Sequence, residues 1–111
     1  MENFTPAKLQ ESLDSGAAVF LKLWKKGCGA CKLSIPAVER LEEALGSELL
    51  FAQISVDEFP EMHEIAETEV LPAFFVFKNK AMAGSFTGFK GLKALDEFVR
   101  GALELGVRDD V

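Results

Sequence analysis

The 111-residue chain contains no tyrosine, one tryptophan, one histidine and two cysteines. Its ten phenylalanines therefore supply aromatic bulk that carries no hydroxyl and serves packing. A mononuclear zinc site takes about four ligands, and two cysteines with the distant His63 do not supply them within one chain. Because nothing in the sequence near His63 orients it, we expect a solvated surface histidine. Gly84, Gly88 and Gly91 lack the spacing of a phosphate-binding motif. We expect no metal and no bound cofactor.

Long apolar runs are also missing, so the sequence predicts no transmembrane helix. The residues Met1–Thr5 do not have the basic and apolar regions of a secretory signal, and we expect a cytoplasmic protein. In that reducing compartment, a close cysteine pair is more often catalytic or metal-binding than structural. The net charge of −6 argues against nucleic acid and against an anionic membrane as partners.

Residues 15–38 of this acidic chain contain no acidic residue at all. The segment holds Lys22, Lys25, Lys26 and Lys32 and thus carries a charge of +4, which leaves −10 for the other residues. One interpretation is a solvated, lysine-rich loop. The other is a positive potential around the cysteines, which lie in the same segment, that lowers the thiol pKa and favours acidic partners.

The two cysteines form a Cys-Gly-Ala-Cys motif at residues 28–31, between the apolar run Val19–Trp24 and a helical pattern that extends to Leu45. Two thiols at this spacing can form a disulfide or separate as a dithiol. A chain with 49% apolar residues does not need this cross-link for its core. So short a loop would also remove little entropy from the unfolded chain. The motif therefore favours redox chemistry over a structural role.

Hydrophobic periodicity and turn residues predict alternating helices and strands. We expect helices over Pro6–Asp14, Cys28–Leu45, Phe59–Glu67 and Leu92–Glu104, and strands over Ala17–Trp24, Leu49–Val56, Ala73–Phe77 and Ala81–Phe86. Pro36 should bend the second helix by removing a backbone hydrogen bond. Residues Lys78–Lys80 form the turn of a hairpin, and the polar tail from Gly106 should fray. This order predicts one α/β domain over residues 1–111, with parallel strands first and an antiparallel hairpin last.

The segment Phe20–Pro36 resembles the thioredoxin family in its strand, tryptophan, CGxCK motif and helix-kinking proline. Residues Val70–Ala73 resemble the cis-proline loop of that family, and Gly88 falls where the family has a glycine before the last helix. The resemblance covers roughly residues 4–105. It implies the thioredoxin fold, in which a central mixed β-sheet of about four strands is flanked by four α-helices. Whether a short fifth strand forms at the N-terminus is left open.

The resemblance implies a thiol–disulfide oxidoreductase that exchanges disulfides with protein substrates and takes part in cell redox homeostasis. Cys28, at the helix N-terminus, would be the nucleophile, and Cys31 would resolve the mixed disulfide. The substrate-binding positions that it implies are Trp24, Gly27, Gly29, Ala30, Leu71, Pro72 in the cis form, and Gly88. It further implies a monomer that takes electrons from a separate reductase of the thioredoxin-reductase type and has no bound cofactor.

The sequence departs from the family pattern at four positions around the motif. Gly27 replaces a tryptophan, and Ala30 replaces a proline. Lys22 stands where the family has a buried aspartate, and Gln53 where it has the lysine paired with that aspartate. Burial lowers a lysine pKa, so Lys22 would either accept the proton of Cys31 or, if charged, stabilise a thiolate. Alternatively, the Lys22 stem packs while its ammonium extends to solvent.

Two further functions are weighed against disulfide reduction. The first is a redox-sensing regulatory or binding module on a thioredoxin scaffold, which the missing aspartate and tryptophan keep open. The second is a metal or iron–sulfur bridge between two chains, which Pro72 beside the motif disfavours.

Overall fold

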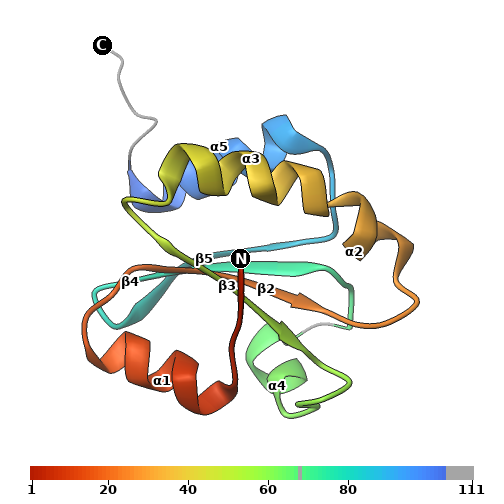
Figure 1. Ribbon diagram of the computed structural model, residues 1–111, viewed down its shortest axis with the longest axis horizontal. Helices are drawn as coiled ribbons and strands as arrows, with labels where there is room; N and C mark the ends of the chain where they lie inside the picture. The colour runs from red at the N-terminus through yellow and green to blue at the C-terminus, as the bar shows by residue number, and fades with distance from the viewer. Residues whose placement is uncertain (68, 105–111) are drawn as a thin grey trace.

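The computed structural model describes residues 1–67 and 69–104. A five-stranded sheet in the order β1-β3-β2-β4-β5 lies between two layers of helices (Figure 1). The strands are β1 (Glu2–Asn3), β2 (Val19–Trp24), β3 (Leu50–Ser55), β4 (Ala73–Lys78) and β5 (Ala81–Thr87). β3 is parallel to β1 and β2, whereas β4 is antiparallel to β2 and β5. The expected mixed sheet is confirmed, and β1 is the fifth strand that the sequence left open.

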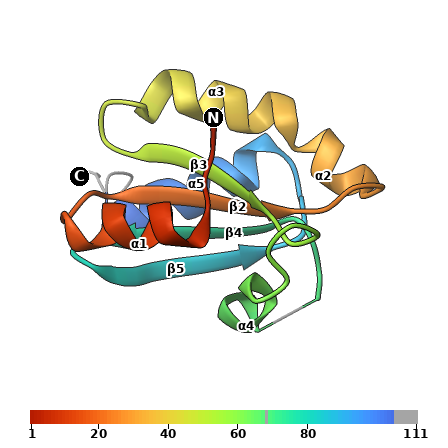
Figure 2. The same ribbon diagram turned by 60° about the horizontal axis from the view of Figure 1, so that its bottom comes forward.

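Helices cover both faces of the sheet (Figures 1 and 2). α1 (Pro6–Asp14) and α4 (Met62–Ala66) lie on one face, α3 (Ile35–Leu45) and α5 (Leu92–Leu103) on the other, and α2 (Gly29–Leu33) leads into α3. None of the helices in residues 1–67 and 69–104 is long and apolar enough to cross a membrane.

The second predicted helix is divided at Ser34, which ends α2 and begins α3. The cause is Pro36, which has no N–H to donate to the carbonyl of Lys32 and whose ring crowds that carbonyl. The break therefore falls in the turn that precedes the proline. The bend was expected, but the one-residue break at Ser34, whose backbone angles stay in the right-handed helical region, was not.

Several predicted boundaries differ from the structure by a few residues. The strand predicted over Ala17–Trp24 is β2 and begins at Val19, and α4 is shorter than predicted because residues 56–58 and 60–61 form turns. Pro60 accounts for the shorter helix, since it lacks an N–H and disfavours helical geometry at the residue before it. The hairpin turn is as expected, with Asn79 and Lys80 at φ of 55° and 67°, in the range that two-residue hairpin turns use. The tail from Gly106 lies outside the described residues.

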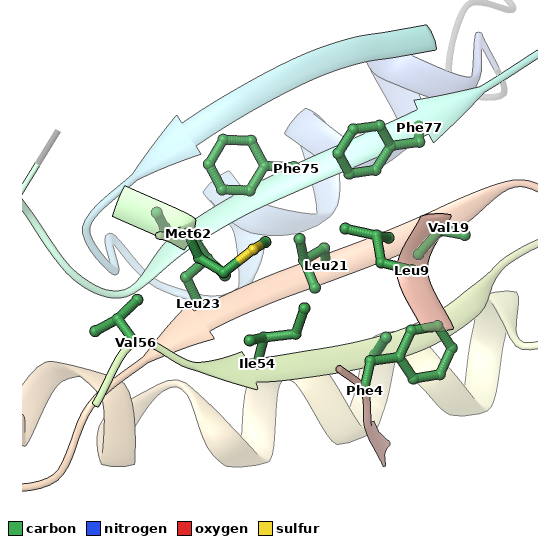
Figure 3. Close-up of a cluster of buried hydrophobic side chains, with 12 residues drawn as sticks. Phe4, Leu9, Val19, Leu21, Leu23, Ile54, Val56, Met62, Phe75 and Phe77 are labelled. Carbon is green, nitrogen blue, oxygen red and sulfur yellow. The ribbon is translucent and has the colours of Figure 1, made fainter. Parts of the chain in front are cut away.

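Side chains of β2 alternate between the two core layers. Val19, Leu21 and Leu23 belong to a cluster under α1 and α4, and Figure 3 shows Leu9 and Met62 turned toward this strand. Phe20 belongs to the opposite cluster, under α3 and α5. The same alternation directs Lys22 toward the α3 side, next to the apolar cluster that contains Phe20.

Candidate active site

The cysteine motif lies just beyond the end of the sheet, where β2 leads through a short loop into α2 (Figure 1). Cys28 and Cys31 are joined by a disulfide. Cys28 is the N-cap of α2, and its Sγ accepts the backbone N–H of Cys31 at 3.1 Å. Cys28 is half-buried, whereas Cys31 is only 3% exposed. Once the disulfide opens, the N–H that faces Cys28 Sγ stabilises a thiolate there, on the sulfur that an outside partner can reach.

The loop before β4 supplies the second wall of the site. The Leu71–Pro72 peptide bond is cis, the conformation that the resemblance implies. The carbonyl oxygen of Leu71 lies 3.7 Å from Cys28 Sγ, and the backbone N–H of Gly88 donates to the carbonyl of Pro72 at 2.7 Å. The structure thus brings Leu71 to the disulfide, and Gly88 to the neighbouring Pro72, from segments that are distant in sequence.

Lys22 approaches the disulfide from inside the core. Its side chain is 2% exposed, and its Nζ donates to the carbonyl oxygen of Cys31 at 3.0 Å. In the sheet, Lys22 is opposite Gln53 of β3 and Phe74 of β4. Desolvation by burial lowers the pKa of Lys22 from 10.5 to about 8. The ammonium therefore does not extend to solvent, and that alternative is wrong.

Ser34 is a site residue that the sequence reasoning missed. Its Oγ donates to the same Cys31 carbonyl at 2.7 Å, and the residue is completely buried. The available signal was local, because serine side chains often donate to the carbonyl three or four residues earlier. The break between α2 and α3 is thus held by two side-chain donors on one oxygen.

A pocket of about 350 Å³ opens beside the disulfide. It is lined by Lys22, Trp24, Lys25, Lys26, Gly27, Cys28, Cys31, Lys32, Ile35 and Gln53. All the lysines of the acid-free segment are among these residues, and none of the lining residues is acidic. The predicted positions Gly29, Ala30, Leu71, Pro72 and Gly88 are not part of this pocket. Ile35, which is 43% exposed, is a wall that sequence reasoning missed.

Gly27 has a conformational reason to be glycine. Its φ is +72°, in the left-handed region that side chains disfavour, and a Cβ there would meet nothing within 4 Å. The same turn is held by Asp57, whose Oδ2 accepts the backbone N–H of Lys26 at 2.9 Å. The replacement of tryptophan by Gly27 therefore allows a specific backbone turn and does not simply loosen the loop.

We expected a solvated surface histidine at residue 63, but His63 is half-buried. Its neighbour Met62 is 1% exposed and packs into the core, which draws α4 onto the sheet. The His63 Nδ1 and the Trp24 Nε1 are buried and have no hydrogen-bond partner among the described residues. Within the same residues, no group of three or more His, Cys, Asp or Glu side chains is placed to hold a metal ion.

Comparison with known proteins agrees with this geometry. The thioredoxin family model matches residues 1–101. The chain is 32% identical to a thioredoxin of Bacillus subtilis (strain 168) over 85 residues, which cover 77% of this chain and 82% of the relative. It is 27% identical to a thioredoxin of Rhodospirillum rubrum over 104 residues, 93% of this chain and 100% of the relative. In fold, it is similar to oxidised mitochondrial thioredoxin 3 from Saccharomyces cerevisiae, with a TM-score of 0.81, 20% identity and coverage of 91% and 94%.

Proposed function

The chain belongs to the thioredoxin family and is a thiol–disulfide oxidoreductase, and from this premise we propose that it reduces disulfides in protein substrates. Electrons come from a separate reductase, and the protein acts as a cytoplasmic monomer. Family members work through a redox-active disulfide without a prosthetic group. The observation that carries the proposal is the Cys28–Cys31 disulfide, which joins an accessible sulfur to a buried one.

In the proposed reaction, the Cys28 thiolate of the reduced protein attacks one sulfur of a substrate disulfide. The substrate S–S bond breaks, a mixed disulfide forms, and the first substrate thiolate leaves and takes a proton. The Cys31 thiolate then attacks Cys28 Sγ, which re-forms the Cys28–Cys31 bond and releases the second substrate thiolate. The substrate gains two electrons, and the reductase returns two electrons and two protons to the protein.

The loop at Leu71 and Pro72 suits an extended substrate segment. Leu71 presents its backbone 3.7 Å from the attacking sulfur. Trp24 and Gly27 line the pocket beside the disulfide, while Gly29 and Ala30 form the first turn of α2. We assign these positions and Gly88 to substrate binding.

We assign Lys22 the role of stabilising the Cys31 thiolate. Its Nζ is bound to the backbone of Cys31 and has almost no contact with water. With a pKa of about 8, this group is mostly charged at neutral pH and has no free lone pair with which to accept a proton. A cation so close to the resolving cysteine favours the charged form of its thiol.

Reduction of insulin by the protein, with dithiothreitol as electron source, tests the proposed function. Wild type should accelerate the reaction, and Cys28→Ser should abolish the acceleration. Pre-reduced Cys31→Ser, freed of dithiothreitol and then mixed with insulin, should accumulate a mixed disulfide that mass spectrometry detects. If wild type does not reduce insulin and the Cys31→Ser variant forms no mixed disulfide, the reductase proposal fails. The regulatory module would then be preferred, although the comparisons give it no support.

A further inference from the structure

The pocket beside the disulfide gathers lysines that form no side-chain ion pair with a carboxylate among residues 1–67 and 69–104. Lys25, Lys26 and Lys32 are exposed on its rim, and Lys22 is buried at its base. Ion pairs in the described part of the chain join Met1 to Glu42, Lys8 to Glu11 and Arg100 to Asp96, and none includes a pocket lysine. Asp57 reaches the loop, but its hydrogen bond there is to the backbone N–H of Lys26.

This charge is concentrated in one place on an otherwise acidic protein. The chain has a net charge of −6, so the +4 of the segment 15–38 is set against −10 elsewhere. The fold brings these lysines to one concave surface, where low-dielectric walls concentrate the field and raise the local concentration of anions. An acidic group that approaches the protein is therefore attracted to the redox site and repelled by most of the remaining surface.

The occupant of the pocket must lie within reach of the sulfurs, because Cys28 and Cys31 are themselves lining residues. Neighbouring residues of an extended peptide are about 3.3 Å apart along the chain. The side chains one or two positions from an attacked cysteine therefore reach the pocket, where they meet the ammonium groups and the apolar wall of Ile35. A volume of about 350 Å³ accommodates such side chains.

We propose that the lysine pocket binds Asp and Glu side chains that flank the target cysteine, so that the protein prefers acidic disulfide substrates. This inference rests on the proposed function and specifies its substrate class. Lys25, Lys26 and Lys32 act as specificity-determining residues, and the preference depends on charge and not on the sequence of apolar residues around the disulfide.

Three peptides with the same intramolecular disulfide test the proposal, with the flanking residues either Asp and Glu, or Asn and Gln, or Lys. Each is mixed with excess pre-reduced protein, and the second-order rate constant of reduction is measured at 10 mM and 500 mM NaCl. At low salt, the acidic peptide should react about tenfold faster than the neutral one, and the basic peptide more slowly. At high salt, screening should bring the three rates together.

Two variants of equal net charge locate the effect. K25Q/K26Q/K32Q should reduce the acidic-to-neutral rate ratio to about 1, whereas K8Q/K80Q/K93Q removes three exposed lysines outside the pocket and should keep the wild-type ratio. The ratio is the readout because both rates use the same Cys28 thiolate, so a changed thiol pKa cancels.

The outcomes separate this inference from the function on which it rests. If wild type reduces none of the peptides, the reductase proposal fails. If it reduces the neutral peptide and shows no acidic preference, or if both triple variants lose the preference equally, the lysine pocket proposal is overturned. Glutathione disulfide, a small anionic disulfide, is the last substrate. Lysine-dependent reduction of it without any preference among the peptides would assign the pocket to small molecules and also overturn the proposal.

Discussion

Lys22 donates from Nζ to the carbonyl oxygen of Cys31 at 3.0 Å, which anchors a buried cation to the backbone of the proposed resolving cysteine. Ser34 donates to the same oxygen from the turn between α2 and α3. One carbonyl thus links the charge beneath the disulfide to the geometry of the helix break. Changes at Lys22 should therefore alter both the stability of the fold and the chemistry of Cys31.

Stability should depend on pH through Lys22. Its pKa is about 8 in the folded protein and 10.5 when unperturbed, so between these values the unfolded chain holds more protons. The free energy of unfolding of wild type therefore rises with pH across this window, whereas the penalty for burying the charge is fully present below pH 8. In urea unfolding of the oxidised protein, the stability of Lys22→Met relative to wild type should fall by about 1–3 kcal/mol from pH 7 to pH 10.5.

Lys93→Met serves as the control for this measurement, because Lys93 is exposed on α5. Its stability relative to wild type should stay constant over the same range. A Lys22→Met difference that is equally constant would contradict a lowered Lys22 pKa. The hydrogen bond from Lys22 to the Cys31 carbonyl does not add to this pH dependence, since the neutral amine also donates.

The Cys31 thiol should titrate at a higher pH without Lys22. In a Cys28→Ser background, which leaves Cys31 as the single thiol, Lys22→Met should raise the Cys31 pKa by about one to three units. Ultraviolet absorbance of the thiolate measures this value. Lys22→Arg keeps the charge and cannot accept a proton at these pH values, so the Cys31 pKa should stay near its value in the Cys28→Ser parent.

An unchanged Cys31 pKa in Lys22→Met would contradict the proposed electrostatic role of Lys22. If resolution of the mixed disulfide in wild type then accelerated above pH 8, and lost that acceleration in Lys22→Met, the neutral amine would be the proton acceptor instead. If neither effect is observed, the role of Lys22 is structural only.

Ser34 and Lys22 should be energetically coupled. Ser34→Ala alone should cost about 1 kcal/mol, because Lys22 still donates to the Cys31 carbonyl. In the double variant with Lys22→Met, that buried oxygen loses both side-chain donors, and the loss of stability should exceed the sum of the single effects by about 1 kcal/mol. Urea unfolding at pH 7 measures this cycle.

Ser15 provides a matched control for the cycle. Its Oγ makes the same kind of bond, to the carbonyl of Ser12 at 2.7 Å, at the end of α1. Ser15→Ala and Lys22→Met should therefore be additive. Additivity for Ser34 as well would show that the shared carbonyl does not couple the two residues.

Glycine should matter at residue 27 and not at residue 29. A Cβ has open space at both positions, but Gly27 has a φ of +72° whereas Gly29 begins α2. Gly27→Ala should therefore destabilise the protein by about 1 kcal/mol, and Gly29→Ala should leave stability equal or up to about 1 kcal/mol higher. Denaturant midpoints compare the two, and equal losses would show that the backbone turn is not the cause.

Much of the fold was predictable because its signals are local. The apolar run with Lys22 predicted a buried strand, and the Lys78–Lys80 turn predicted the hairpin; both are present. The interruption at Ser34 was missed, since the periodicity of the helix continues through it. The partial burial of His63 was missed too, because it depends on how α4 packs against the sheet and not on the residues beside it.

The sequence by itself determined the class of chemistry: two cysteines at helix-turn spacing after a buried strand favour redox chemistry, and the family resemblance implies disulfide exchange. Only the tertiary structure decided where the charges lie. It joins Lys22 to a residue nine positions away and brings Leu71 to Cys28 across 43 positions. The physical reason is that spacing and capping act within a few residues of chain, whereas these contacts arise from the packing of the sheet against its helices and loops.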